Sequence, residues 1–171
     1  MINSFGEASA SVIGRIQSIA TWCRLDVLEA ALGLAQEIAR EGREGQRIGT
    51  LFTIGDAEAV LDRSRPLILD PLAGHTPAAT HISDPRLRGT IKQLAQLDGA
   101  FVIDENGIVR AACQYLDVSA QGVDLPLGLG TRHLAAAAIS KELRVIAIAV
   151  SESSRIRVFY RGGLLAEIDA E

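Results

Sequence analysis

A run of six consecutive apolar residues, Val145–Val150, is the feature that most limits how this chain can fold. An uninterrupted apolar run of this length is typical of a central strand that is buried on both faces. It is far shorter than the roughly 20 residues that a membrane-spanning helix needs. The sequence therefore predicts a strand in the middle of a sheet, and no membrane partner.

The N-terminal quarter of the chain has the apolar period of a helix. From residue 11 to residue 43 apolar side chains recur every three or four positions, with a break near residues 22–26. Gly42 and Gly45 end the pattern, and the small, mostly polar residues 1–10 predict a frayed end. We divide the 171 residues into a helical segment, 1–45, and a second part, 46–171.

The second part alternates short strand patterns with helical ones. Strands are expected at residues 47–54, 67–69, 100–103, 108–112, 145–150, 155–160 and 164–168, with 155–160 as an outer strand. Helices are expected after the N-capping residues Asp56 and Asp84, and from Thr131 to about residue 143. Hairpins and helical crossovers both occur, so the predicted fold is a single α/β domain with a central mixed sheet flanked by helices.

An Asn-Gly pair at 106–107, between two apolar runs, predicts a β-hairpin. With these two residues at the centre of the turn, facing residues have numbers that sum to about 213. Ala100 then faces Cys113, and Asp98 lies opposite Tyr115, at the same sheet edge as Leu116.

Composition excludes several classes of function. The formal net charge is −4, whereas a chain that holds a nucleic-acid backbone is usually basic, so this chain alone is not expected to bind nucleic acid. Two cysteines and three histidines stand at no zinc-ligand spacing, and Cys23 and Cys113 are expected to be buried thiols. No signal-peptide pattern precedes the helical segment, so a cytoplasmic location is expected.

Three short stretches carry side chains suited to chemistry. Gly130-Thr131-Arg132-His133 opens an Ala-rich helix, and anions bind at such helix starts because the first N–H groups lack intrahelical partners. Ser151-Glu152 follows the buried strand directly, and Asp98-Gly99-Ala100 precedes the hairpin. We expect these stretches to meet at one end of the sheet, where they supply a carboxylate, phosphate donors and an apolar shelf for a base.

These stretches, in this order, resemble the diadenylate cyclase (DisA-type nucleotide-binding) family. The likeness covers about residues 47–163 and rests on D-G-A at 98–100, G-T-R-H at 130–133 and S-E at 151–152. The resemblance implies that two ATP molecules, held by two domains facing each other, condense to cyclic di-AMP with release of pyrophosphate and with help from Mg²⁺ or Mn²⁺.

The resemblance also implies roles for individual residues. Asp98 would bind the metal and help to activate the 3′-hydroxyl, with Glu152 as a further metal ligand. Gly99, Ala100 and Leu116 would frame the nucleoside. The phosphates would be held by Gly130, Thr131, Arg132, His133 and Ser151.

Two positions depart from the family pattern. Leu134 follows His133 where an arginine is common, and Ser153 follows Glu152 where a second glutamate is common. Affinity for the triphosphate is then either lower or maintained by another residue. Two alternatives to the enzyme therefore stay open at this point: a module that binds ATP or cyclic di-AMP without turnover, and a structural domain that assembles through its helical segment.

Overall fold

A seven-stranded mixed sheet forms the middle layer of the computed structural model, which describes residues 4–170. Its strands are β1 (Thr50–Gly55), β2 (Ser64–Pro66), β3 (Ala100–Asp104), β4 (Val109–Leu116), β5 (Val145–Val150), β6 (Arg155–Tyr160) and β7 (Gly163–Asp169). Their order across the sheet is β2-β4-β3-β1-β5-β6-β7. β1 pairs in parallel with β3 and antiparallel with β5, and every strand–strand contact besides β1–β3 is antiparallel. The predicted mixed sheet is confirmed.

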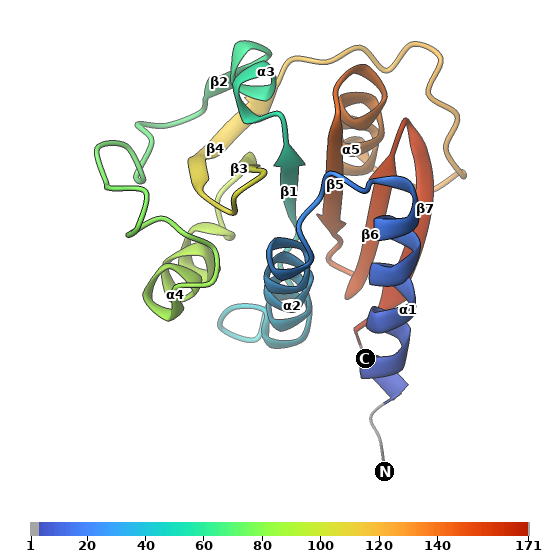
Figure 1. Cartoon of the computed structure of the whole chain (residues 1–171), viewed down its shortest axis with the longest axis horizontal. Coiled ribbons are helices and arrows are strands. Elements are labelled where there is room, and N and C mark those ends of the chain that lie inside the picture. Colours follow the sequence, from blue (N-terminus) through green and yellow to red (C-terminus); the bar gives the residue numbers. More distant parts are fainter. Residues whose placement is uncertain (1–3, 171) are drawn as a thin grey trace.

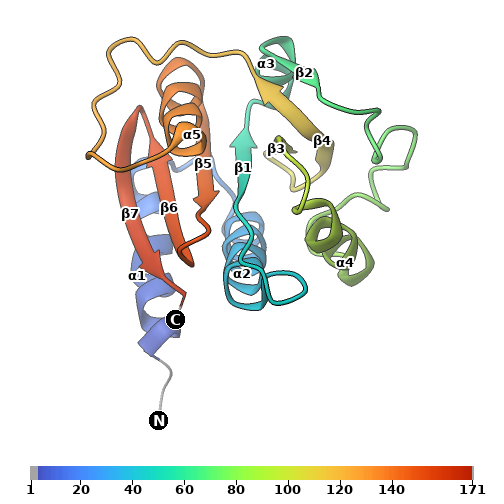
Figure 2. The ribbon, with the colours of Figure 1, turned by 180° about the vertical axis from the view of Figure 1, so that it is seen from behind.

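Helices cover both faces of this sheet. They are α1 (Ser4–Ile19), α2 (Leu25–Glu41), α3 (Ala57–Asp62), α4 (Pro85–Leu94) and α5 (Thr131–Glu142). In Figure 1 α1 lies in front of β6 and β7, α2 packs on β5 and β6 from the same side, and α5 lies behind the sheet. Figure 2, seen from behind, reverses this order and brings α5 to the front. The strand β5 is therefore enclosed between two helical layers, which explains why all six of its residues are buried.

Alternation along the strands divides the core into two clusters. Phe52, Ile148 and Val158 point toward α1 and α2. Eight residues of α2 are buried against this face of the sheet. Leu51, Ala147 and Phe159 point to the other face, against the small side chains of α5. Because alanines dominate this helix, its backbone can approach the sheet closely.

The two N-terminal helices differ from the sequence prediction at one end only. The predicted break near residues 22–26 is confirmed, since α1 ends at Ile19 and α2 starts at Leu25. The predicted frayed end at 1–10 is wrong from residue 4 onward, and its first three residues lie outside the described part. α1 begins at Ser4, and its residues Val12 and Ile16 are buried in the core.

Capping residues behave as the sequence predicts. The carboxylate of Asp56 accepts a hydrogen bond from the backbone N–H of Ala59 at 3.3 Å. That of Asp84 accepts one from the backbone N–H of Arg86 at 2.8 Å. Cys23 and Cys113 are free and buried, and burial raises the pKa of the Cys23 thiol to about 11.

Two strand predictions need correction. The short strand expected at 67–69 lies at 64–66, because β2 pairs with the end of β4 from Ser64 opposite Leu116, and the chain then leaves the sheet. Leu69 is accordingly 95% exposed. The strand expected to be the outer one, β6, is inner, since β7 lies beyond it at the edge.

The hairpin register shifts by one residue on either side of its middle. Val102 faces Ala111, which fits the predicted sum, but Ala100 faces Gln114 and Ile103 faces Val109. β4 therefore carries bulges, and Cys113 takes a positive φ of 55° at one of them. No sequence signal marks this bulge, because positive φ is rare for cysteine.

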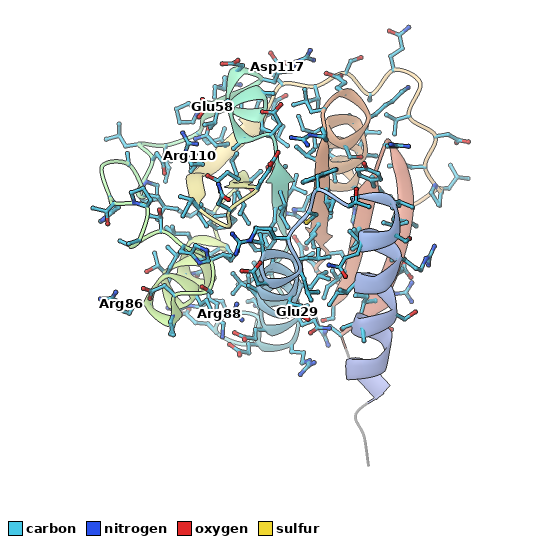
Figure 3. The ribbon with its side chains drawn as sticks, viewed as in Figure 1. Glu29, Glu58, Arg86, Arg88, Arg110 and Asp117 are labelled. Atoms are coloured by element: carbon cyan, nitrogen blue, oxygen red, sulfur yellow. The ribbon has the colours of Figure 1, made fainter. Side chains whose placement is uncertain are left out.

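Ion pairs connect α4 to α2. In Figure 3 Arg88 of α4 lies beside α2, where it donates to the backbone carbonyl of Ala30 at 3.0 Å and to Glu37 at 2.7 Å. Lys92 adds contacts to Glu37 at 2.7 Å and to Glu41 at 3.0 Å. These contacts hold the loop that follows α2 and the loop that follows α4 at a fixed separation.

Among the described residues, no helix has the length and apolar character needed to cross a membrane.

Candidate active site

One end of the sheet brings together segments that are far apart in the sequence. Leu51 pairs with Ala100, so the starts of β1 and β3 lie side by side. Thr50 pairs with Val150, so the end of β5 lies beside them. The segments that precede Thr50 and Ala100 and the segment that follows Val150 therefore share this end of the sheet.

An apolar hollow of about 360 Å³ opens at this end. Its apolar wall comes from β1, β3, β4 and α5, through Leu51, Ala100, Leu116 and Ala135, with Leu67 and Tyr115 at its exposed rim. Asp98, Gly99, Thr131 and Arg132 complete the lining, together with the buried amide of Gln114. Six of the predicted site residues thus line one cavity: Asp98, Gly99, Ala100, Leu116, Thr131 and Arg132.

A second, polar hollow of about 290 Å³ adjoins the first. Asp98 and Arg132 line both hollows and so mark the border between them. Glu152 lines the polar hollow, as expected for a residue directly after β5. The other charged groups of this hollow, Arg43, Glu44 and Arg47, come from the loop after α2.

Gly99 explains why Asp98 can lie at this border. Its φ is 104°, and a Cβ at this position would lie 2.5 Å from the carbonyl carbon of Cys113. Only glycine fits where β3 starts against the bulge of β4. The Asp98 side chain is exposed, and no hydrogen bond or ion pair occupies its carboxylate within residues 4–170, so it is available to a ligand.

The start of α5 has the features of an anion site. Gly130 has no side chain with which to cap the helix, and the first N–H groups of a helix have no intrahelical acceptor. Arg132 lies against Gly49, where a Cβ would come within 2.1 Å of the guanidinium. In the part of the chain that the structure describes, Arg132 makes no ion pair, so its charge is available to an anion.

His133 lies in a different environment from its neighbours. It lines neither hollow, and its ring is buried at 6% exposure, edge-on to Phe159. Arg157 of β6 donates from Nη1 to Nε2 of His133 at 3.1 Å and, through Nε, to Glu167 at 2.6 Å. Because a guanidinium only donates, Nε2 must accept, which places the proton of the neutral ring on Nδ1. Burial, followed by the charges of Arg157 and Arg132, lowers the pKa of His133 below its usual value.

Ser151 and Leu134 also lie outside the two hollows. Ser151 is buried, and its hydroxyl contacts that of Ser153 at 2.7 Å. Leu134 is two residues from Arg132, which turns it to another side of α5. There it lines a neighbouring apolar groove with Val118 and Ala138, which shares Leu116, Thr131 and other residues with the apolar hollow. The departure at Leu134 therefore removes no cation from either hollow of this chain.

The residues that sequence reasoning missed are Arg43 and Arg47. The stretch Arg43–Gly49 was interpreted only as the end of a helix and the beginning of a strand. Its signal was the recurrence of arginine and glycine, R-E-G-R-E-G-Q-R-I-G from position 40, directly before β1. Loops of this composition, next to a strand end, are typical places for anion contacts.

The polar hollow also has ligands that suit a hard divalent cation. Asp98 and Glu152 present exposed carboxylates to the same hollow. Mg²⁺ prefers oxygen ligands and is usually bound through one or two carboxylates plus phosphate and water. Within the described residues there is no cluster of three or more His, Cys, Asp or Glu side chains of the kind that forms a metal cage. A metal shared with a phosphate fits this donor set better than a metal held by protein alone.

Comparison with known proteins decides the family. The sequence model of the family described as "DisA bacterial checkpoint controller nucleotide-binding" (DAC) matches residues 37–164. The chain belongs to the DAC family. This match includes the borders of both hollows, from the loop after α2 to the end of β6.

Curated relatives of this DAC chain are named diadenylate cyclase. One from Methanocaldococcus jannaschii is 48% identical over 143 residues, which cover 83% of this chain and 45% of that protein. One from Haloferax volcanii is 40% identical over 147 residues, which cover 85% of this chain and 52% of that protein. The chain spans about half the length of these relatives.

Solved structures share the fold. DacA from Staphylococcus aureus superimposes with a TM-score of 0.57 at 25% identity, over 81% of this chain and 84% of that one. A protein from Bacillus cereus described as a hypothetical membrane spanning protein gives a TM-score of 0.66 at 20% identity, over 93% of this chain and 71% of that one.

Proposed function

We propose that this chain is a diadenylate cyclase, which condenses two ATP molecules to cyclic di-AMP and releases two pyrophosphates. The observation that carries the proposal is the border between the two hollows. An apolar cavity suited to a nucleoside and a polar cavity suited to phosphates meet at Asp98 and Arg132. Membership of the DAC family and relatives named diadenylate cyclase support this assignment.

The base and ribose are assigned to the apolar hollow. Leu51, Leu116 and Ala135 provide surface that excludes water from the base, and the exposed ring of Tyr115 at the rim is placed to stack on it. Gly99 and Ala100 line the same hollow and are assigned to the sugar.

The α-phosphate is assigned to the border. There Arg132 and the free N–H groups at the start of α5 stabilise the negative charge that gathers on the phosphoryl oxygens. The 3′-hydroxyl oxygen of the second nucleotide forms the new bond to phosphorus. The bond to the bridging oxygen of the β-phosphate breaks, and pyrophosphate leaves with that electron pair. The proton of the 3′-hydroxyl is transferred toward the carboxylate of Asp98 and then to solvent.

Mg²⁺ or Mn²⁺ is the cofactor that we assign. Asp98 and Glu152 would hold it, and when bound it supplies positive charge that lowers the energy of the phosphoryl transition state.

A second copy of the chain supplies the second nucleotide. The reaction joins two nucleotides, and the apolar hollow is assigned to one nucleoside, so a facing copy would bring the other. Leu67 and Tyr115 at the mouth of the hollow are exposed, and the exposed Ile68 and Leu69 follow Leu67 in the chain, which gives apolar surface suited to such a contact. We therefore propose a face-to-face dimer.

Incubation of the full chain with ATP and either Mg²⁺ or Mn²⁺, followed by separation of the nucleotides, tests the proposed function. Cyclic di-AMP is expected with at least one of the two metals. In Asp98→Asn the rate should fall by about 100-fold or more, because the metal ligand and proton acceptor are lost together. Asp62→Asn, which removes an exposed carboxylate outside both hollows, is the matched control and should keep full activity.

The same experiment separates the enzyme from a binding module. Tight ATP binding by a correctly folded chain without cyclic product under either metal would contradict the proposal. Full activity of Asp98→Asn would remove Asp98 from its role.

A further inference from the structure

The polar hollow contains more positive charge than the reacting α-phosphate requires. Three arginines and three carboxylates line it: Arg43, Arg47, Arg132, Glu44, Asp98 and Glu152. Asp98 and Glu152 are assigned to a divalent cation, and Arg132 to the α-phosphate at the border. The guanidinium groups of Arg43 and Arg47 remain, on the side of the hollow away from the nucleoside.

The loop that carries Arg43 is a tight, fixed turn. Arg43 and Gln46 exchange two backbone hydrogen bonds, of 2.7 and 2.8 Å. Between them Glu44 and Gly45 both have positive φ, 51° and 77°, as in the two-residue turns that join antiparallel strands. A Cβ at Gly42 would lie 2.2 Å from the carbonyl oxygen of Gln46, so the chain closes tightly on itself. The turn therefore fixes the backbone position from which the Arg43 side chain extends into the hollow.

The side chain of Arg43 is only partly satisfied. Its Nε is buried and has no hydrogen-bond partner, and its contact with the Glu44 carboxylate is long, at 3.9 Å. A buried donor without an acceptor is unfavourable, and a ligand oxygen removes that cost.

The two walls of the hollow are connected behind it. Arg43 follows α2, and Asp98 follows α4. The ion pairs from Arg88 and Lys92 to Glu37 join these two helices. These ion pairs link the two helices whose following loops line the hollow.

We propose that the polar hollow binds the β- and γ-phosphates of ATP, and the pyrophosphate that leaves, with Arg43 as the residue that the α2–β1 loop contributes. The inference rests on the proposed function, since it assigns the part of ATP that lies beyond the α-phosphate.

Calorimetric titration of the full chain tests the assignment with three probes. These are α,β-methylene-ATP, which cannot turn over, AMP, which has no β- or γ-phosphate, and inorganic pyrophosphate alone. In Arg43→Ala the affinities for the ATP analogue and for pyrophosphate should fall about ten-fold or more, and the affinity for AMP should change by less than about two-fold. Arg43→Lys, which keeps the charge but not the planar donor set, should lie between the wild type and Arg43→Ala.

The matched control is Arg24→Ala. Arg24 is an exposed arginine at the other end of α2, paired with Asp26, and it lines neither hollow. Its removal should alter none of the three affinities. An equal loss for AMP and the ATP analogue in Arg43→Ala would mean that Arg43 only maintains the fold near the site, and would overturn the inference. Unchanged affinity for all three probes would overturn it as well.

The outcome is independent of turnover. A chain that makes no cyclic di-AMP but loses ATP-analogue affinity selectively in Arg43→Ala would contradict the proposed reaction and support the phosphate site. A chain that makes cyclic di-AMP, but in which Arg43→Ala does not selectively lower the affinity for the ATP analogue, would support the proposed reaction and contradict the phosphate site.

Discussion

At the scale of single residues, the backbone at position 99 requires a glycine for structural reasons alone. Its φ of 104° and its 2.5 Å approach to the Cys113 carbonyl carbon leave no space for a Cβ. Asp98 is therefore exposed at the border of the two hollows by a backbone geometry that only Gly99 permits. The D-G-A motif combines a chemical residue with the residue that positions it.

Gly99→Ala should destabilise the fold by about 3 kcal/mol, because alanine is strained at this φ and its methyl group collides with β4. Gly89→Ala is the matched control: Gly89 lies in the interior of α4, and a Cβ there meets no atom within 4 Å. Gly89→Ala should stabilise the protein by about 0.5–1 kcal/mol, because alanine lowers the conformational entropy of the unfolded chain. Urea unfolding of both variants measures the difference, and equal stability of the two would contradict the geometry.

His133 gives the fold a dependence on pH. The pKa of His133 is lowered in the folded state. Below about pH 6.5 the imidazole is therefore protonated in the unfolded chain while it is still neutral in the folded chain. Stability is therefore full above this pH and falls as pH decreases, by at most about 1.4 kcal/mol per pH unit. The facing charges are Arg157, Glu167 and Arg132.

His133→Gln should reduce this loss between about pH 7.5 and 5.5, because glutamine takes up no proton and can still accept from Arg157. His75→Gln, at an exposed loop position, should retain the wild-type pH dependence. Thermal unfolding at both pH values measures the effect. A wild-type pH dependence in His133→Gln would show that the buried imidazole is not its source.

The site could be predicted from the sequence where the place of a residue at a strand end or helix start is enough to fix where its side chain points. Asp98, Arg132 and Glu152 meet as expected, since the ends of three neighbouring strands and one helix start fix them. His133 and Ser151 are buried, because helical rotation and the packing of Arg157 decide their direction, and neither is visible in the motif. The bulge at Cys113 and the arginine loop before β1 also could not be predicted, because contacts with distant parts of the chain decide both and no local motif marks them.

At the scale of elements, ion pairs connect α4 to α2 outside the site. Arg88 and Lys92 both reach Glu37, and the two helices end at opposite walls of the polar hollow. Partial burial raises the pKa of Glu37, but hydrogen bonds from Lys92 and Arg88 outweigh it, so the net pKa is below the usual value. The carboxylate therefore stabilises the folded state above about pH 4.5, and this contribution is lost as pH falls further.

Glu37→Gln should cost about 1 kcal/mol of stability near neutral pH, because two charge-assisted hydrogen bonds become weaker neutral ones. Glu29→Gln removes an exposed carboxylate from the same helix, labelled in Figure 3, and should cost almost nothing. Chemical denaturation at neutral pH compares the two. Equal effects of the two substitutions would mean that the α2–α4 ion pairs are solvated and do not brace the hollow.

Most elements could be predicted because each has a local signal. Asp56 and Asp84 cap their helices, Val145–Val150 is the buried strand, and the Asn-Gly pair lies at the hairpin. β2 was misplaced by three residues because the apolar 67–69 has the stronger strand pattern. Its actual position is set by pairing with β4, a contact between residues about 50 positions apart in the sequence.

At the scale of the whole molecule, the helices before residue 45 and the sheet after it share one core. Val12 and Leu28 belong to the same cluster as Ile148 and Val158. We propose that the boundary at residue 45 divides the sequence into a helical part and a sheet part that fold as one unit. The proposed activity, by contrast, would be divided between molecules, since we assign one nucleoside cavity to each chain and the reaction joins two nucleotides.

In the proposed reaction, two facing chains join two ATP molecules, one from each nucleoside cavity. Its most direct test is the product balance when the full chain is incubated with ATP and Mg²⁺ or Mn²⁺. Cyclic di-AMP is expected, with two pyrophosphates released for each cyclic molecule formed, and both should form about 100-fold or more slowly in Asp98→Asn. ATP that remains intact under both metals, or pyrophosphate released with a linear or mononucleotide product only, would contradict it.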